Sequence, residues 1–307
     1  MSSLFVTHPD CLLHEMGRGH PEQPARLTAI EDQLIASGLM DHLRYLEAPL
    51  AAAEDLERVH SRGYRLALES AAPSAGLVHL DPDTAMNPHT LAAALRAAGA
   101  CVLATDAVIA GTASTAFCNV RPPGHHAGRG RAMGFCFFNN VAIAAARALE
   151  HHGLARVAIV DFDVHHGNGT EEIFRDDARV LMVSIFQHPF YPYSGVEGRS
   201  GRMVNIPLPA HSGGAEFRSA VERFWLPALD AFRPEMIFIS AGFDAHREDD
   251  MAMLGLADGD YAWVTAVVKT LAERHAEGRI VSTLEGGYAL HALGRSVMQH
   301  IKVMSGL

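Results

Sequence analysis

The clearest structural signal in the chain is Val157-Ala158-Ile159-Val160-Asp161-Phe162-Asp163-Val164-His165-His166-Gly167-Asn168-Gly169. Its apolar start is typical of a buried strand in a parallel sheet. Asp161, Asp163 and His165 then alternate with apolar residues, so they share one side of the extended chain. Such ionisable groups on an apolar strand are costly unless they are paired or bind a metal. The segment therefore predicts a metal site at a strand end, with His166 pointing away from it.

Three other predicted strands also end in reactive side chains. They are Thr115 to Val120, Met236 to Ser240 and Arg279 to Leu284, which precede His125-His126, Asp244 and Tyr288 respectively. The carboxyl ends of parallel strands lie along one edge of a sheet, where ligands collect. Asp163, His165 and Asp244 would form the open three-ligand set of a catalytic zinc site. The paired histidines are candidates for acid and base, and the tyrosine for an electrophilic hydrogen-bond donor.

Strands and helices alternate along the chain, which indicates an α/β fold. We predict a mainly parallel, multi-stranded sheet with helices on both faces, in one domain that spans residues 1–307. No repeat or linker divides the chain. The predicted helices include Pro24 to Ser37, His60 to Ala71, Leu91 to Ala110, Glu216 to Phe232 with a kink at Pro227, and Asp258 to Ala276.

Composition narrows the classes of function. The 307 residues are 49% hydrophobic with a formal net charge of −10, which argues against binding to a nucleic-acid backbone. No apolar run approaches the length of a membrane span, and Met1 to Phe5 lacks the features of a signal peptide. We therefore expect a cytoplasmic protein without membrane or nucleic-acid partners. Cys11, Cys101, Cys118 and Cys136 form no Cys-x-x-Cys pair and are expected to be reduced packing residues.

Two polar or aromatic segments allow more than one interpretation. Asp81 and Asp83 could cap a helix or form a rim that positions substrate, and the cap is favoured. Gly134 to Phe138 could be plain core or the wall of a narrow apolar channel beside the histidines. Asn139 or Asn140 is expected to cap the helix that follows.

Four motifs together resemble the zinc-dependent histone deacetylase family. They are Arg121-Pro122-Pro123-Gly124-His125-His126-Ala127, Asp161 to Thr170, Ser240-Ala241-Gly242-Phe243-Asp244-Ala245 and Leu284-Glu285-Gly286-Gly287-Tyr288. The family includes bacterial histone-deacetylase-like amidohydrolases and acetylpolyamine amidohydrolases. The motifs are long and cover nearly the whole chain in order. Asn168 and the chain length are most similar to the bacterial class II-like members.

The resemblance implies an arginase/deacetylase fold with one zinc ion held by Asp163, His165 and Asp244. Zinc would polarise the amide carbonyl and acidify its water. His126 would take a proton from that water and later deliver one to the leaving amine. His125, oriented by Asp161, would act as an electrostatic partner, and Tyr288 would hydrogen-bond the carbonyl. Acetate and a free amine would leave.

The resemblance also implies structural potassium. One ion would lie beside the zinc site, bound by Asp161 and Ser184 with backbone carbonyls of Asp163, His165 and Ile185. Backbone carbonyls around Phe174, Asp177 and Val180 would hold a second ion. Asp161 would then serve both the potassium and His125, as residues that surround a metal site often do.

The chain departs from the family pattern at residues that bear on substrate. Asn168 stands where many class I members have an aspartate, so His126 should be less basic here. In the substrate channel formed by Gly134, Phe135, Tyr191 and Met251, Tyr191 replaces a common phenylalanine and makes the wall more polar. Met251 aligns with the glutamate of polyamine-preferring members and offers no charge for a polyamine. An acyl-lysine side chain is therefore the favoured substrate.

Alternatives remain open at this point. A polyamine or other small-amide deacetylase would act on a small acylated amine. A catalytically silent protein would bind acyl-lysine without releasing acetate. An arginase-like hydrolase with two manganese ions would need more ligands than these motifs offer. A homo-oligomer is compatible with the family, since bacterial relatives often form dimers or tetramers. Fold-level analogy does not fix the substrate.

Overall fold

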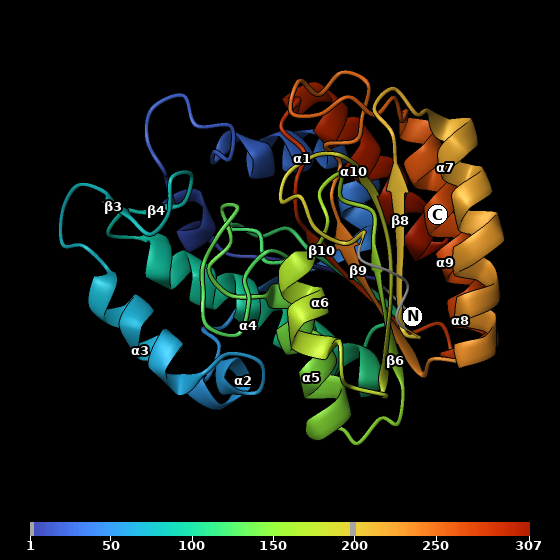
Figure 1. The fold of residues 1–307 in the computed structure, drawn as a ribbon, viewed down its shortest axis with the longest axis horizontal. Helices are drawn as coiled ribbons and strands as arrows, with labels where there is room; N and C mark the ends of the chain where they lie inside the picture. Colours follow the sequence, from blue (N-terminus) through green and yellow to red (C-terminus); the bar gives the residue numbers. More distant parts are fainter. Residues whose placement is uncertain (1–2, 197–200) are drawn as a thin grey trace.

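A computed structural model describes residues 3–196 and 201–307 (Figure 1). Met1 and Ser2, part of the N-terminal segment considered for signal-peptide features, lie outside the described residues. The centre of the fold is an eight-stranded sheet in which every neighbouring pair is parallel. In sheet order its strands are β2 (Leu43–Glu47), β1 (Ser3–Thr7), β5 (Thr115–Cys118), β10 (Ile280–Leu284), β9 (Met236–Ala241), β6 (Val157–Asp161), β7 (Val180–Gln187) and β8 (Met203–Leu208). A separate antiparallel pair comprises β3 (Val78–His79) and β4 (Ala85–Met86).

Helices cover both faces of this sheet, as its apolar strands require. Those described are α1 (Ala25–Ala36), α2 (Ala53–Glu57), α3 (Arg62–Ala71), α4 (Thr90–Ile109), α5 (Asn140–Glu150), α6 (Asn168–Phe174), α7 (Gly214–Ala220), α8 (Leu226–Phe232), α9 (Asp258–His275) and α10 (Leu290–Ser305). Short helical turns occupy Pro9–Leu12, Leu39–His42 and Val221–Trp225. Helices α4 and α5 pack together in one layer, and α1, α10 and α9 pack together in another (Figure 1). The predicted α/β class is confirmed.

The core is centred on strands β5, β10, β9 and β6, whose residues are all buried. A strand that is buried on both faces is continuously apolar. These four strands could therefore be predicted from their apolar runs in the sequence. Strand β2 was not predicted. It is an edge strand with exposed residues such as Tyr45, so it lacks the apolar run. The four cysteines are free and buried, as expected.

Two details of the helix predictions need correction, and one open alternative is decided. The segment from Glu216 to Phe232 is helical throughout, as predicted, but a π-helical turn, Val221–Trp225, joins α7 to α8 in place of the expected kink at Pro227. Pro227 lies in the first turn of α8, where its missing N–H is tolerated. Helix α3 begins at Arg62, and the Ser61 side chain accepts a hydrogen bond from the Tyr64 amide as its cap. At the start of α5 it is Asn139 that caps, through the Ala142 amide.

Helix α4 also corrects the expectation that no apolar run could span a bilayer. By length and composition alone it is the one candidate span among residues 3–196 and 201–307. Most of its apolar window is buried inside the protein, and alanines such as Ala97 and Ala98 are completely covered. Small side chains let this helix lie close to the sheet, which is the environment of a core helix.

The sheet order brings the reactive loops together. Strands β5, β10, β9 and β6 are consecutive neighbours, and they precede the loops with His125-His126, Tyr288, Asp244 and Asp163. All four strands run in the same direction, so these loops leave from the same edge of the sheet. The predicted meeting of four strand ends is confirmed.

Candidate active site

Asp163, His165 and Asp244 form a buried cluster at this edge. Their potential ligand atoms all lie within 4.8 Å of one another, and no second group of this kind occurs in the described part of the chain. Nδ1 of His165 lies 2.9 Å from Oδ1 of Asp163 and 3.2 Å from Oδ2 of Asp244. Strand β6 ends at Asp161, so the two candidate ligands Asp163 and His165 lie in the loop beyond it. His166 is directed elsewhere, to Ser194 Oγ at 2.8 Å.

The environment of the cluster fits a divalent cation. Oδ2 of Asp244 is buried, and beyond its 3.2 Å contact with Nδ1 of His165 it has no hydrogen-bond partner. Burial and the neighbouring Asp163 carboxylate raise the pKa of Asp244 to about 6, because two buried negative charges repel each other. Two carboxylates and an imidazole are ligands that zinc accepts, and three protein ligands leave a position for substrate or water. A Cβ atom at Gly286 would lie 2.0 Å from Asp244 Oδ2, so only glycine leaves this oxygen free.

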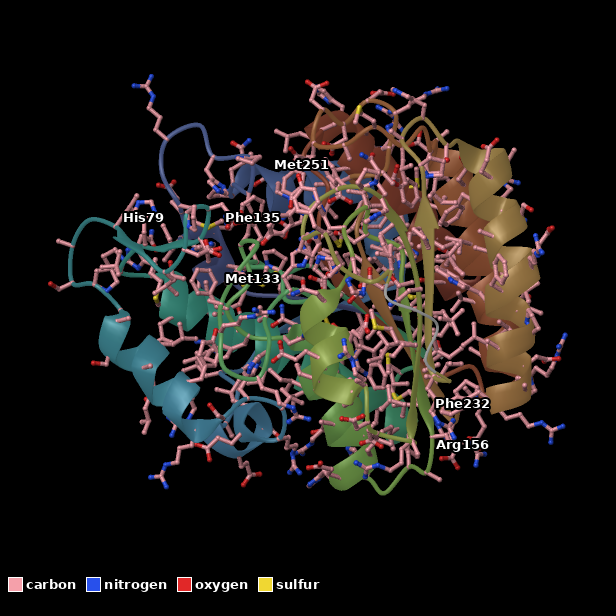
Figure 2. The ribbon with its side chains drawn as sticks, viewed as in Figure 1. His79, Met133, Phe135, Arg156, Phe232 and Met251 are labelled. Atoms are coloured by element: carbon pink, nitrogen blue, oxygen red, sulfur yellow. The ribbon has the colours of Figure 1, made fainter. Side chains whose placement is uncertain are left out.

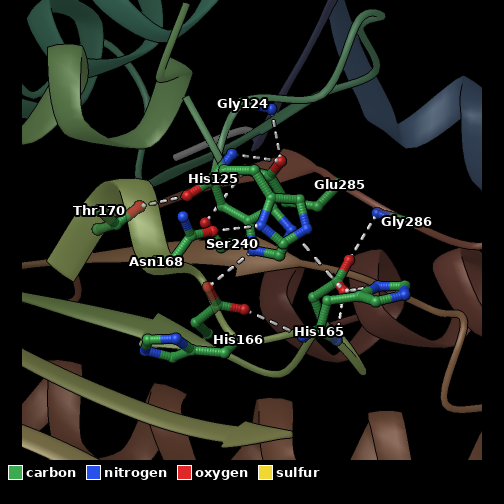
Figure 3. Close-up of polar contacts among 12 residues, drawn as sticks. Gly124, His125, His165, His166, Asn168, Thr170, Ser240, Glu285 and Gly286 are labelled. Atoms are coloured by element: carbon green, nitrogen blue, oxygen red, sulfur yellow. Dashed lines mark hydrogen bonds and ion pairs between the residues drawn. The ribbon is translucent and has the colours of Figure 1, made fainter. Parts of the chain in front are cut away.

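The two adjacent histidines have different hydrogen-bond partners, and Figure 3 shows the polar surroundings of His125. Their ring centroids are 4.0 Å apart. Nδ1 of His125 is 3.1 Å from Oδ2 of Asp161, whereas Nδ1 of His126 is 2.7 Å from Oδ1 of Asn168. The His125 amide donates to Oε2 of Glu285 at 3.1 Å. His125 therefore faces a carboxylate, and His126 faces an uncharged amide.

This difference separates the pKa values of the two imidazoles. Burial disfavours a charged His125, but the carboxylates of Asp163 and Asp161 outweigh it and raise the His125 pKa to about 10. Burial and the positive charges of His125 and His165 hold the pKa of His126 well below its ordinary value. Near neutral pH the pair thus offers one cationic and one neutral imidazole. Titratable neighbours with opposed shifts are typical of an acid–base site.

Tyr288 follows β10 and completes the arrangement. Its ring lies edge-on to Phe135 at 6.1 Å, and the Arg26 guanidinium lies over it at 4.9 Å from the ring centroid. Burial raises the pKa of the Tyr288 hydroxyl well above its ordinary value, so the group stays protonated as a hydrogen-bond donor. Arg26 also donates from Nε to the Gly287 carbonyl at 2.6 Å.

A cavity of about 220 Å³ leads to this site. The four predicted channel residues line it, together with both histidines, His165 and Tyr288; the four are Gly134, Phe135, Tyr191 and Met251. Figure 2 labels two of them, Phe135 and Met251. Tyr191 lies edge-on to His126, with ring centroids 5.3 Å apart. Phe190 stacks on His165 at 5.3 Å. The aromatic segment is thus channel wall at Phe135, whereas Phe137 and Phe138 belong to the core.

The favoured interpretation of Asp81 and Asp83 was wrong. Neither caps a helix, because α4 begins at Thr90 and His89 is its N-cap residue. Oδ1 of Asp81 accepts a hydrogen bond from the Asp83 amide at 3.0 Å, which forms a local turn. Of the two, only Asp83 lines the cavity, so the rim alternative matches the structure at Asp83.

Several residues of the site were not singled out from the sequence. Phe190 and Pro123 line the cavity, Arg26 contacts Tyr288, and Glu285 accepts from the Gly124 amide at 2.7 Å. Glu285 and Pro123 lie within the quoted motifs, close in sequence to candidate site residues. This proximity could have identified them from the sequence. Arg26 lies on the amphipathic helix α1, where nothing in the pattern sets it apart from a surface arginine.

Comparisons with known proteins agree with this geometry. A sequence model of the histone deacetylase domain matches residues 20–304. The histone deacetylase-like amidohydrolase of Pseudomonas aeruginosa is 43% identical over 281 residues, which cover 88% of this chain and 73% of that protein. The human polyamine deacetylase HDAC10 is 36% identical over 328 residues, covering 100% of this chain and 48% of that protein. The crystal structure of the HDA15 HD domain matches with a TM-score of 0.94 at 35% identity, covering 99% of this chain and 90% of that one.

Fold, site and relatives together define an α/β amidohydrolase with an arginase/deacetylase fold. The chain belongs to the histone deacetylase family, whose members are in general zinc-dependent deacetylases. The resemblance inferred from the four motifs is therefore confirmed.

Proposed function

We propose that this protein hydrolyses the amide bond of N-acetyl- or N-acyl-lysine side chains and releases a carboxylate and a free amine. The observation that carries the proposal is the ligand cluster Asp163, His165 and Asp244 beside a narrow cavity lined by His125, His126 and Tyr288. An aliphatic side chain with an amide at its tip suits a narrow, mostly apolar channel that ends at polar groups.

One zinc ion per chain would be held by Asp163, His165 and Asp244. When bound, Zn²⁺ supplies Lewis acidity, which polarises a carbonyl and makes water a stronger acid. Protein side chains would carry out the proton transfers. Nδ1 of His126 donates to Asn168, which leaves Nε2 free to accept a proton from the attacking water. The same nitrogen then returns a proton to the departing amine.

His125 and Tyr288 would stabilise the charge that develops during attack. His125, paired with the Asp161 carboxylate, would add positive charge next to the reacting group when it is protonated. The Tyr288 hydroxyl would donate to the substrate carbonyl, a contact that strengthens as the oxygen gains negative charge. Tyr288→Phe should therefore lower kcat more than it raises KM.

Structural potassium is a further part of the proposal. Ser184 Oγ is buried and has no hydrogen-bond partner. Ser184 is paired in register with Asp161 on the neighbouring strand, so a cation beside Asp161 could bind both. The second ion, near the carbonyls of Phe174, Asp177 and Val180, stays a prediction. If the first ion binds, KCl should raise the melting temperature more than equimolar tetramethylammonium chloride.

The second candidate function is deacetylation of acetylpolyamines. It is supported by the similarity to human HDAC10 and by Asp83 on the cavity wall, where a carboxylate could bind a distal ammonium group. Met251, on the same wall, offers no such charge. An Asp83 carboxylate can equally accept backbone N–H groups of a peptide, so acyl-lysine is preferred.

The test is a screen of zinc-loaded protein against acyl-lysine peptides of several acyl lengths and a matching set of acylpolyamines. We expect turnover of peptides, loss of turnover with a chelator and recovery with zinc. An Asp163→Ala, Asp244→Ala double variant that keeps full turnover would refute the metal-dependent mechanism. Higher kcat/KM on polyamines would favour the second candidate. Binding of acyl-lysine with no release of carboxylate would indicate a silent binding protein.

We further propose that residues 1–307 form a single catalytic domain that acts in the cytoplasm, without nucleic-acid or membrane partners. A homo-oligomer is compatible with this assignment. Fractionation of cells and the measured mass of the purified protein in solution test these two points.

A further inference from the structure

The loop that carries Tyr288 is fixed by side chains from three distant parts of the chain. The Gly286 amide donates to Oδ2 of Asp163 at 2.8 Å, and Arg26 donates to the Gly287 carbonyl. The third is Asp249, whose Oδ2 accepts from the amides of Tyr288 at 2.6 Å and Ala289 at 2.9 Å. Asp249 thus binds the backbone of the tyrosine itself.

The other oxygen of the same carboxylate reaches the channel wall. Oδ1 of Asp249 accepts from the Met251 amide at 3.0 Å. Met251 and Tyr288 both line the cavity, although they are far apart in the sequence. One buried carboxylate, with 6% of its surface exposed, therefore joins two walls of the cavity through three backbone amides.

A purely structural role is the alternative. Ala289 is the N-cap residue of α10, and it has no side-chain oxygen to cap the helix. A carboxylate at a helix N-terminus is favourable, since it meets unpaired N–H groups and the positive end of the helix dipole. A capping role predicts lower stability when Asp249 is changed. It does not predict an effect that depends on the Tyr288 hydroxyl.

We infer that Asp249 is a positioning residue. It sets where the Tyr288 hydroxyl meets the substrate carbonyl, and it holds Met251 at a fixed position relative to Tyr288. The inference rests on the proposed function, in which Tyr288 donates to that carbonyl. The hydroxyl acts mainly in the transition state, so its displacement lowers kcat. A shift of about 1 Å in a catalytic group can cost about 100-fold in rate.

The decisive variant is Asp249→Asn. An asparagine of the same size has one acceptor oxygen and one donor nitrogen, so it cannot accept from all three amides. We expect kcat to fall about 10- to 100-fold, with KM changed less than about twofold. In a Tyr288→Phe background the same change should cost less than about twofold, because the hydroxyl it positions is absent. Asp250→Asn, an exposed neighbour, is the matched control and should leave kcat unchanged.

Stability and zinc content are measured for each variant. If Asp249→Asn does not fold, Asp249→Glu keeps the charge beside α10 and displaces the oxygens by one methylene. The inference is overturned if Asp249→Asn has the kcat of the unmodified protein. It is also overturned if the loss is equally large with and without the Tyr288 hydroxyl, since this is the result of a structural cap.

A readout without turnover separates this inference from the proposed function. The six tyrosines can be replaced by 3-fluorotyrosine, and Tyr288→Phe assigns the Tyr288 resonance in the ¹⁹F NMR spectrum. Asp249→Asn should shift or broaden that resonance, and Asp250→Asn should not. An unmoved resonance counts against the inference. If no acylated amine is hydrolysed, the proposed function fails, whereas the spectrum still reports whether Asp249 positions Tyr288.

Discussion

Nδ1 of His126 lies 2.7 Å from Oδ1 of Asn168, and the other side of the same amide faces a sulfur atom. Asn168 donates from Nδ2 to Sδ of Met133 at 3.4 Å. A thioether accepts hydrogen bonds and does not donate them, so the amide nitrogen belongs on the Met133 side. The amide oxygen therefore faces His126, which must carry its proton on Nδ1. Asn168 fixes the tautomer of His126 without adding charge.

The first prediction concerns the charge at position 168. Asn168→Asp places a carboxylate against Nδ1 and should raise the pKa of His126, since an opposite charge at this distance favours the imidazolium. His126 must be neutral to accept a proton, so the acidic limb of kcat/KM should move to higher pH by about one to three units. Profiles of kcat/KM against pH test this. Asp176→Asn, at an exposed position, is the control, and an unmoved limb in Asn168→Asp would contradict the role of His126.

The second prediction concerns Met133. Met133→Leu keeps an apolar side chain of similar size and removes the acceptor for the Asn168 amide. The amide can then rotate, and a flipped amide presents N–H groups to His126. We expect kcat to fall about tenfold with little change in melting temperature. In an Asn168→Asp background the substitution should have almost no effect on kcat, because a carboxylate has two equivalent oxygens. Equal losses in both backgrounds would mean that Met133 acts by packing alone.

The success of the sequence prediction follows from how local each signal is. Asp163 and His165 lie in one segment directly after a buried strand, and Asp244 and Tyr288 follow strands of the same kind. Local pattern therefore placed these side chains near one another before the sheet order was known. Asp249 gives no such signal. Its role depends on contacts with Tyr288 and Ala289, 39 and 40 residues away, which only the packed loops create.

The wrongly predicted helix cap at Asp81 and Asp83 shows the same limit. Asp81 and Asp83 precede a helix closely enough to suggest a cap, and capping is the commoner role for aspartate there. The structure instead uses Asp81 in a turn with the Asp83 amide, and helix α4 starts only at Thr90. The sequence shows that this segment carries two carboxylates. It does not show which backbone amides these carboxylates would bind.

The third prediction tests the close approach of the channel wall to His126. Gly134 has φ +57°, and a Cβ atom there would lie 2.5 Å from Cδ2 of His126. Gly134→Ala must therefore displace the His126 imidazole or the wall, and, if His126 is the proposed base, activity should fall by about 100-fold or more. Gly130→Ala in the same segment is the control, since a Cβ atom there meets nothing within 4 Å. Activity assays and circular dichroism of both variants separate displacement from unfolding. Full activity in Gly134→Ala would show that the wall can yield.

The fourth prediction concerns the buried charges beneath Tyr288. Glu22 forms ion pairs with Arg121 and Arg26 and lies 3.4 Å from Nε2 of His14, with no exposed side chain among the four. Burial alone would raise the pKa of Glu22, but Arg121, His14 and Arg26 hold it well below the ordinary value of 4.5.

Glu22→Gln leaves the arginines without their counter-charge and should cost about 3–5 kcal/mol of unfolding free energy at neutral pH. A depressed carboxyl pKa stabilises the fold above the unfolded-state value, and this contribution is lost as pH falls through the folded-state pKa. The difference in unfolding free energy between the two proteins should thus be constant near neutral pH and shrink below about pH 4.5. Denaturant titrations across this range, with the exposed Glu15→Gln as control, measure it, and a difference that grows on acidification would show that Glu22 is not ionised in the folded protein.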